Sequence, residues 1–283
     1  MTQNQPSPLV MKLKIILSGV LLLGLTQGCV DLKAIQDFAK ISAESADYTS
    51  LVDNYLDFPN RQKRYQPEDR HAQLDTMARE RMTRKTELLL RHEIIEEYME
   101  ALGGLAADDI VDKSKEIGQL TTTLETQVGT SPAETQAFGK ITEILTKAVS
   151  DGWRKRQLQK LIAQSNDPLQ IILKSLKQIV SNGFIGDDQN EQRAIQAYYR
   201  TKIAESTDPA GIAALKEWQE LRTTNLADHT NSLQTYATLI GEISQGHQKL
   251  YDERKDLAKA QLVEQIKQSA KDLKDLLKII KKI

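Results

Sequence analysis

One stretch near the end of the chain decides the fold that the sequence predicts: Ala258-Lys-Ala-Gln-Leu-Val-Glu-Gln-Ile-Lys-Gln-Ser-Ala-Lys-Asp-Leu-Lys-Asp-Leu-Leu-Lys-Ile-Ile280. Its apolar residues recur at alternating spacings of three and four, as Val263, Ile266, Ala270, Leu273, Leu277 and Ile280. This period places them along one face of an α-helix, as in the seam of a coiled coil. A helix with such a face buries it against other helices, so the stretch predicts a helical bundle.

Upstream of this stretch the chain shows further helical patterns. An apolar period begins at Pro209 and continues for about 40 residues, which predicts a helix about 60 Å long. Ser131-Pro132-Ala133-Glu134 is a capping box with proline at the first helical position, and it predicts a helix start. Asp167-Pro168 and Asp208-Pro209 combine a capping residue and a proline in the same way, so each is expected to begin a helix.

Helix ends are expected where breakers interrupt these patterns. Pro59 is expected to end a first helix, Gly103-Gly104 a long second one, and Asn182-Gly183 a later one. No segment alternates long enough to predict a strand, and the composition, with 5% aromatic residues, is that of helical bundles. The predicted fold class is all-α: an elongated, antiparallel, coiled-coil-like bundle of about eight helices, in one domain over residues 29–283.

A second informative stretch lies near the N-terminus and reads Met11-Lys-Leu-Lys-Ile-Ile-Leu-Ser-Gly-Val-Leu-Leu-Leu-Gly-Leu-Thr-Gln-Gly-Cys29. Two lysines precede an apolar run, Ile15 to Leu25, that is too short to span a bilayer. Small Gly28 then precedes Cys29, which is the only cysteine in the sequence. This arrangement resembles the signal peptide and lipobox of bacterial lipoproteins.

The resemblance implies where in the cell the protein is located. Residues 1–28 would be a signal peptide, with translation starting at Met1 or at Met11, and Cys29 would be acylated and anchor the chain in a lipid bilayer. Val30 follows the cysteine, and a non-acidic residue there resembles the outer-membrane sorting signal of Gram-negative lipoproteins. The expected location is therefore the outer membrane, facing the periplasm, with the inner membrane and the cell surface as alternatives.

The charge balance bears on the class of partner. The chain has 38 basic and 39 acidic residues, and loss of residues 1–28 would remove two lysines, leaving 36 basic residues and a net charge of −3. Nucleic-acid binding calls for a clearly basic domain, so no nucleic-acid partner is expected. No later run approaches 18 uninterrupted apolar residues, so no membrane-spanning helix is expected in the mature chain.

The sequence contains no strong motif for chemistry. A Gly-rich phosphate loop, a nucleophile elbow and a four-ligand metal spacing are all missing from it. His92-Glu93-Ile94-Ile95-Glu96 lacks the second histidine of zinc proteases, and it is interpreted as a surface pair of His92 and Glu96. Asp187-Asp188 is interpreted as capping a helix start. Trp218 is interpreted as a core residue, with a place in the lining of a ligand groove as the alternative. No enzymatic activity, cofactor or metal site is therefore predicted.

The last helix has two interpretations. Residues 267–283 hold six lysines and two aspartates beside a broad apolar face. Such a helix can lie on an anionic membrane or dock in a partner's groove, and it can equally close the bundle, which is the favoured interpretation. The candidate binding residues are Lys267, Lys271, Lys274, Lys278, Lys281 and Lys282.

Together these features predict a membrane-anchored, non-enzymatic helical lipoprotein of the bacterial envelope. It would act as a scaffold or accessory subunit with an envelope protein as its partner. One alternative is an immunity or inhibitor lipoprotein directed against a toxin that acts in the periplasm. Another, from a different class, is an enzyme or small-ligand sensor with a site inside the bundle, which would require convergent polar groups on a pocket.

Overall fold

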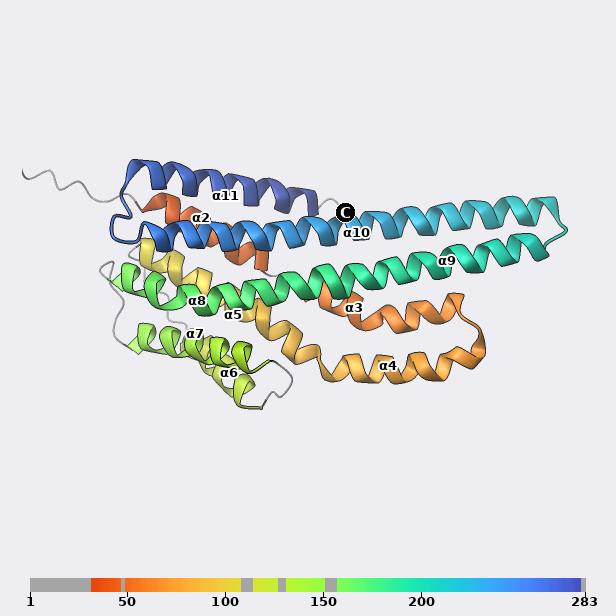
Figure 1. The fold of residues 1–283 in the computed structure, drawn as a ribbon, viewed down its shortest axis with the longest axis horizontal. Helices are drawn as coiled ribbons and strands as arrows, with labels where there is room; N and C mark the ends of the chain where they lie inside the picture. The colour runs from red at the N-terminus through yellow and green to blue at the C-terminus, as the bar shows by residue number, and fades with distance from the viewer. Residues whose placement is uncertain (1–31, 47–48, 108–113, 127–130, 151–156, 281–283) are drawn as a thin grey trace, which may run out of the picture. The chain divides into compact units, whose positions relative to one another are not determined.

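The computed structural model describes residues 32–46, 49–107, 114–126, 131–150 and 157–280. Within these ranges the protein is helical and has no strand, which confirms the predicted all-α fold class (Figure 1). The α-helices are α2 (Lys33–Ala46), α3 (Thr49–Gln62), α4 (His71–Thr83), α5 (Lys85–Ala107), α6 (Ser114–Thr126), α7 (Pro132–Ser150), α8 (Leu158–Gln178), α9 (Ile185–Glu205), α10 (Pro209–Asp252) and α11 (Ala260–Ile280). All of them belong to one compact unit, Leu32–Ile283.

Helix α2 packs against three other helices. It contacts α5, α10 and α11, and its buried face is rich in alanine and serine, which allow neighbouring backbones to approach closely. Phe38 on this face is fully buried against Gly246 of α10, where an added Cβ would lie 2.3 Å from the Cε2 atom of the phenylalanine ring. A Cβ added to Gly103 of α5 would lie 3.4 Å from the Cβ of Ala39. Two glycines therefore make room for α2.

The predicted helix end at Gly103-Gly104 is wrong, because α5 continues through both residues to Ala107. Glycine costs about 1 kcal/mol in a helix interior relative to alanine. Here Gly103 gives α2 its close approach, and the neighbouring Leu102 and Leu105 are buried in the core. Tertiary packing therefore outweighs the low helix propensity of glycine.

Two prolines expected at helix boundaries lie inside helices instead. Pro59 is buried within α3, and Pro168 lies within α8, so Asp167-Pro168 does not begin a helix. A proline in a helix interior costs about 3 kcal/mol. Buried leucine and isoleucine residues occur on both sides of Pro168, and their packing offsets that cost: Leu161, Ile162, Leu169 and Ile172.

The two other capping predictions are confirmed. The backbone N–H of Glu134 donates to Ser131 Oγ, and that of Ser131 donates to Glu134 Oε2, both at 3.3 Å. Asp208 accepts hydrogen bonds from the N–H groups of Ala210 and Gly211, at 3.1 and 2.8 Å. Helix α10 then runs for 44 residues, close to the predicted length.

Helices α8 and α9 are joined without a break. Asn182-Gly183, expected to end a helix, lies inside a π-helix, Ile179–Phe184, that leads directly into α9. A π-turn accommodates an extra residue while the helical path continues. Val180 and Phe184 are buried within this turn and hold it against the core.

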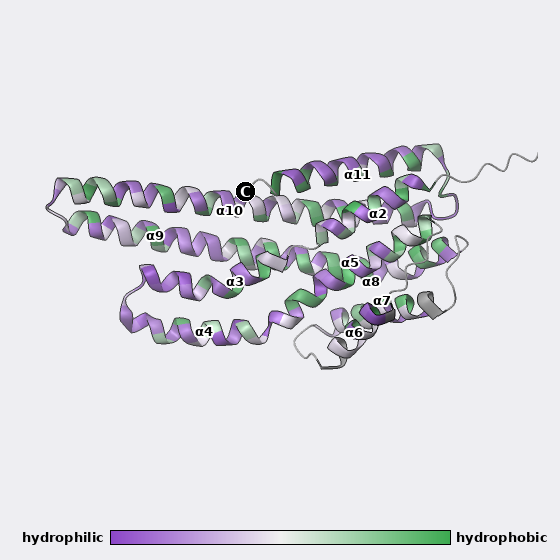
Figure 2. Ribbon diagram, turned by 180° about the vertical axis from the view of Figure 1, so that it is seen from behind, coloured by the Kyte–Doolittle hydropathy of each residue, from purple (hydrophilic) through white to green (hydrophobic). Residues whose placement is uncertain are grey.

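Helix α11 closes the bundle, as favoured from the sequence. It packs against α2 and α10, and its apolar seam residues Ile266, Leu273 and Leu277 are buried between them. Hydrophilic residues cover much of its remaining surface (Figure 2). Among the described helices, none combines the length and the hydrophobicity that crossing a membrane requires.

Candidate functional site

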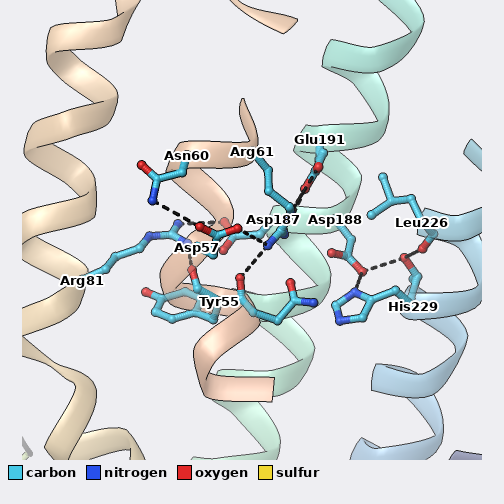
Figure 3. Close-up of polar contacts among 12 residues, drawn as sticks. Tyr55, Asp57, Asn60, Arg61, Arg81, Asp187, Asp188, Glu191, Leu226 and His229 are labelled. Carbon is cyan, nitrogen blue, oxygen red and sulfur yellow. Dashed lines mark hydrogen bonds and ion pairs between the residues drawn. The ribbon is translucent and has the colours of Figure 1, made fainter. Parts of the chain in front are cut away.

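A group of buried acidic side chains with basic partners lies at the start of α9. Asp187, Asp188 and Glu191, here called the acidic cluster, follow the π-helix directly and are all buried. Arg81 of α4 binds Asp187 through two hydrogen bonds of 2.5 and 2.9 Å. Arg61 of α3 lies 3.0 Å from the Glu191 carboxylate. Figure 3 shows these side chains converging from separate helices.

Arg81 connects three helices. Its guanidinium donates to the carbonyl oxygen of Tyr55 at 2.8 Å and lies over the Tyr55 ring, 4.1 Å from its centroid. It also lies 4.7 Å from the centroid of the Phe58 ring. Burial raises the pKa of Asp187 more than the hydrogen bonds and the charge of Arg81 lower it. The planar guanidinium suits this position because it can bind a carboxylate and stack on aromatic rings at once.

The third carboxylate reaches α10. Asp188 Oδ2 is 2.7 Å from His229 Nδ1 and accepts a hydrogen bond from Thr230 Oγ1 at 2.9 Å. The aspartate orients the imidazole, and the other ring nitrogen of His229 is buried without a hydrogen-bond partner among the described residues. Such a pair can act as a general base only where a substrate reaches that nitrogen. Across the described residues no three side chains of the metal-binding types form a possible metal site.

The acidic cluster corrects one prediction. Asp187 and Asp188 were expected to cap a helix start, but α9 continues from the π-helix and its first turn has no free N-terminus. Their carboxylates instead bind side chains from α4 and α10. Because each carboxylate of the cluster is matched by a basic or hydroxyl group of another helix, the cluster fastens α3, α4 and α10 to α9.

Two histidines form polar contacts inside the core. His92 is 1% exposed, and its Nδ1 atom lies 2.9 Å from the carbonyl oxygen of Ala46, so the prediction that His92 lies on the surface is wrong. His247 lies between Tyr98, whose hydroxyl is 2.6 Å from Nε2, and Asn166, whose Oδ1 is 3.0 Å from Nδ1. Burial lowers the pKa of His247 to about 3, so its imidazole is neutral at pH 7.

A buried arginine joins α5 to α7. Arg91, 2% exposed, donates to Glu87 at 3.0 Å and to Glu134 at 2.8 Å. The Ser175 hydroxyl of α8 donates to the same Glu134 carboxylate, which also completes the capping box of α7. Burial raises the pKa of Glu134, but the hydrogen bond from Ser175 and the charge of Arg91 outweigh it and bring that pKa below its usual range.

A different kind of surface lies beyond the acidic cluster. The segment 200–231, here called the distal arm, comprises the end of α9 and the first half of α10, and none of its residues is buried. Trp218 and Leu221 are 56% and 53% exposed, and their i, i+3 spacing places them on one face of α10. Trp218 was predicted to be a core residue, and that prediction is wrong. In the arm α9 and α10 pair mainly with each other, which leaves the outer side of each helix open (Figure 1).

The sequence-predicted binding residues are only partly described. Lys267, Lys271, Lys274 and Lys278 are exposed on α11. Lys281, Lys282 and the expected acylation site Cys29 lie outside the described residues. The acidic cluster and the exposure of Trp218 were not predicted, because each depends on contacts between helices far apart in the chain.

Comparison of the chain with protein families, with curated proteins and with solved structures finds no match. Its function is therefore inferred from its own residues.

Proposed function

We propose that this chain is a membrane-anchored, non-enzymatic helical lipoprotein of the bacterial envelope that presents its distal arm to an envelope protein. The observation that carries the proposal is the exposure of Trp218 and Leu221 on a segment without buried residues. Tryptophan is strongly enriched among the residues that dominate binding energy at protein interfaces. Adjacent exposed apolar side chains are a common mark of such a surface.

The acidic cluster supports this role by holding the base of the arm. Arg81 and Arg61 attach α9 to α4 and α3, and His229 attaches α10 to α9. A surface that is held in its binding conformation loses less entropy on association than a mobile one. The arrangement favours a scaffold or accessory subunit that binds a partner without large rearrangement.

The proposed anchor rests on the sequence from Met11 to Cys29 and on its resemblance to lipoprotein signal peptides. Several acyl chains together hold a protein on a bilayer stably, whereas one chain gives only marginal binding. The proposed location is the outer membrane, with the helical unit in the periplasm.

Anchoring predicts a specific response to Cys29→Ser. Because the substitution removes the only thiol that can be acylated, we expect the protein to move from the membrane fraction to the soluble fraction. The measurement is immunoblotting after separation of the two fractions. Ala213→Ser, an equally small change on the exposed arm, serves as the control and should remain in the membrane. Unchanged membrane association of the Cys29 variant would contradict the anchor.

Partner binding predicts a position-specific crosslink. A photoreactive amino acid in place of Trp218, in intact envelopes, is expected to give one dominant protein adduct, identified by mass spectrometry. The same group at Ala213, on another face of α10, should not give it. Trp218→Ala should reduce co-purification of that partner by about tenfold or more, with unchanged circular dichroism.

The identity of the adduct separates the candidate roles. A resident envelope protein would support the scaffold or accessory role, and a toxin would support the immunity alternative. Equal adducts from positions 218 and 213 would show that the arm has no specific partner, and the proposal would then be wrong.

A further inference from the structure

Helix α11 carries an ordered row of positive charge on its outer surface. Lys267, Lys271, Lys274 and Lys278, here called the lysine stripe, are spaced four, three and four residues apart and are all exposed. At 100° per residue they fall within a sector of about 60°. The acidic residues of α11 lie on one flank of this sector: Glu264, Asp272 and Asp275. The helix therefore separates its basic residues from its acidic ones.

Half of the lysine stripe is not neutralised by ion pairs. Lys267 binds Glu264 at 2.9 Å and Lys278 binds Asp275 at 2.8 Å. Lys271 and Lys274 form no ion pair with any residue that the structure describes. The hydrogen bond from Lys278 lowers the pKa of Asp275, and the charges of Lys271 and Lys274 lower it further. The four lysines thus form one region of positive potential.

The apolar face of α11 is not available for binding. Ile266, Leu273 and Leu277 are buried against α2 and α10, so α11 cannot insert that face into a membrane without leaving the bundle. A contact made by the outer surface of α11 would therefore be mainly electrostatic. Anionic phosphate groups are the complementary chemistry, because clustered lysines near a membrane are attracted to anionic lipid headgroups.

A short stretch of sequence connects the proposed anchor to the start of α2. Lys33, the first residue of α2, follows Cys29 by four residues, a length that spans at most about 14 Å of extended chain. Helix α2 packs directly against α11, and both helices start at the same end of the bundle in Figures 1 and 2. The exposed edge of α2 has two lysines and two acidic residues and adds no net charge: Lys33, Asp37, Lys40 and Glu44.

We propose that the lysine stripe rests on the anionic phospholipid headgroups of the bilayer that holds acylated Cys29. Helix α11 then lies along the membrane surface, and the tether at the start of α2 keeps it there. This inference rests on the proposed lipid anchor, and it adds which face of the helical unit meets the membrane.

The test uses the full-length lipidated protein in vesicles. Acylation blocks Cys29, so one engineered cysteine provides a unique thiol for a fluorescent label. Lys274→Cys places the label on the stripe, and Gln265→Cys places it on the opposite flank of the exposed surface of α11. Vesicles contain phosphatidylcholine, with or without phosphatidylglycerol, and carry a quencher attached to lipid headgroups.

In vesicles with phosphatidylglycerol, we expect quenching at position 274 to exceed that at position 265 by about threefold. The difference should vanish without the anionic lipid and at high salt, because salt screens exposed charges. Adding Lys271→Glu and Lys278→Glu to the Lys274→Cys protein should reduce quenching to the level at position 265, while the protein still floats with the vesicles.

The other outcomes are decisive as well. Equal quenching at both positions in protein that floats with the vesicles would overturn the proposed orientation and leave the anchor intact. Failure of the lipidated protein to float would overturn both proposals. If quenching is weak at position 274 in vesicles but an acidic protein shields the same label in intact envelopes, the stripe binds that protein and the lipid assignment is wrong.

Discussion

Gly246→Ala is expected to destabilise the protein by about 2–3 kcal/mol. An added Cβ would lie 2.3 Å from Cε2 and 2.5 Å from Cζ of Phe38, much closer than van der Waals contact. The Phe38 ring is fully buried, so the overlap can be relieved only if the ring or the helices around it shift. The expected effect is a lower midpoint of urea denaturation, measured by circular dichroism.

Gly139→Ala is the matched control for this substitution. Gly139 lies on the exposed side of α7, and nothing lies within 4 Å of the position that its Cβ would take. Alanine has the higher helix propensity, so this variant should gain about 0.5–1 kcal/mol. Phe38→Leu should partly rescue Gly246→Ala, because a smaller side chain relieves the overlap, and the two effects should be clearly non-additive. Equal stabilities of the two glycine variants would contradict the close contact of α2 with α10.

Acidification from pH 6.5 to pH 4.5 is expected to cost the folded state about 2 kcal/mol through His247 alone. The pKa of this imidazole is about 3 in the folded protein against an ordinary value of 6.5. Between these values the unfolded chain binds a proton that the folded protein does not bind. Stability therefore falls as the pH falls through this window, and His247 has no effect on it above the window.

The measurement is the free energy of unfolding as a function of pH, for the wild type and for His247→Gln. Glutamine can form hydrogen bonds in the core but does not titrate. Within this pH window the free energy of unfolding of the variant should therefore change with pH by about 1.4 kcal/mol per pH unit less than that of the wild type. Burial raises the pKa values of Glu93 and Asp187, so these groups make stability rise as the pH falls. Their contribution is the same in both proteins and is removed when the two pH profiles are subtracted. Identical slopes for both proteins would show that His247 is not buried in neutral form.

The loss of stability through His247 begins at a higher pH than the loss through the partly buried carboxylate of Glu134. The pKa of Glu134 lies below its ordinary value of 4.5. The stability that its ionised carboxylate contributes is therefore lost only as the pH falls below about 4.5. A second decline in stability is expected there, when protonation weakens its contacts with Arg91 and Ser175. The order of the two declines follows from these pKa values.

The parts of the fold that depend on local chemistry were predictable from the sequence. The seam of α11, the length of α10 and the caps at Ser131 and Asp208 each depend on residues within a few turns of one another. Helix boundaries were predicted less well where contacts with distant helices determine them. The sequence predicts a helix end at Gly103 and a helix start at Asp167-Pro168, but distant helices bury the residues around both positions and the helices continue through them.

The candidate sites were hardly predictable, for a related reason. Arg81 and Asp187 are 106 positions apart, and no periodicity links them. Trp218 fits an apolar period, but a period does not reveal whether a third helix covers that face. The lysines of α11 were found from the sequence, because their spacing alone places them on one side of the helix.

The packing of α2 against α10 and α11 also determines the order in which the protein can assemble. Its neighbours α10 and α11 are the last described helices to be synthesised, and more than 200 residues separate α2 from α11. Ribosomes release the N-terminal part first, so Phe38 and its alanine-rich surroundings emerge long before α10 and α11. Contacts over such separations slow folding. The newly emerged α2 therefore presents an uncovered apolar face until the C-terminal helices arrive, and during that interval it needs protection from aggregation.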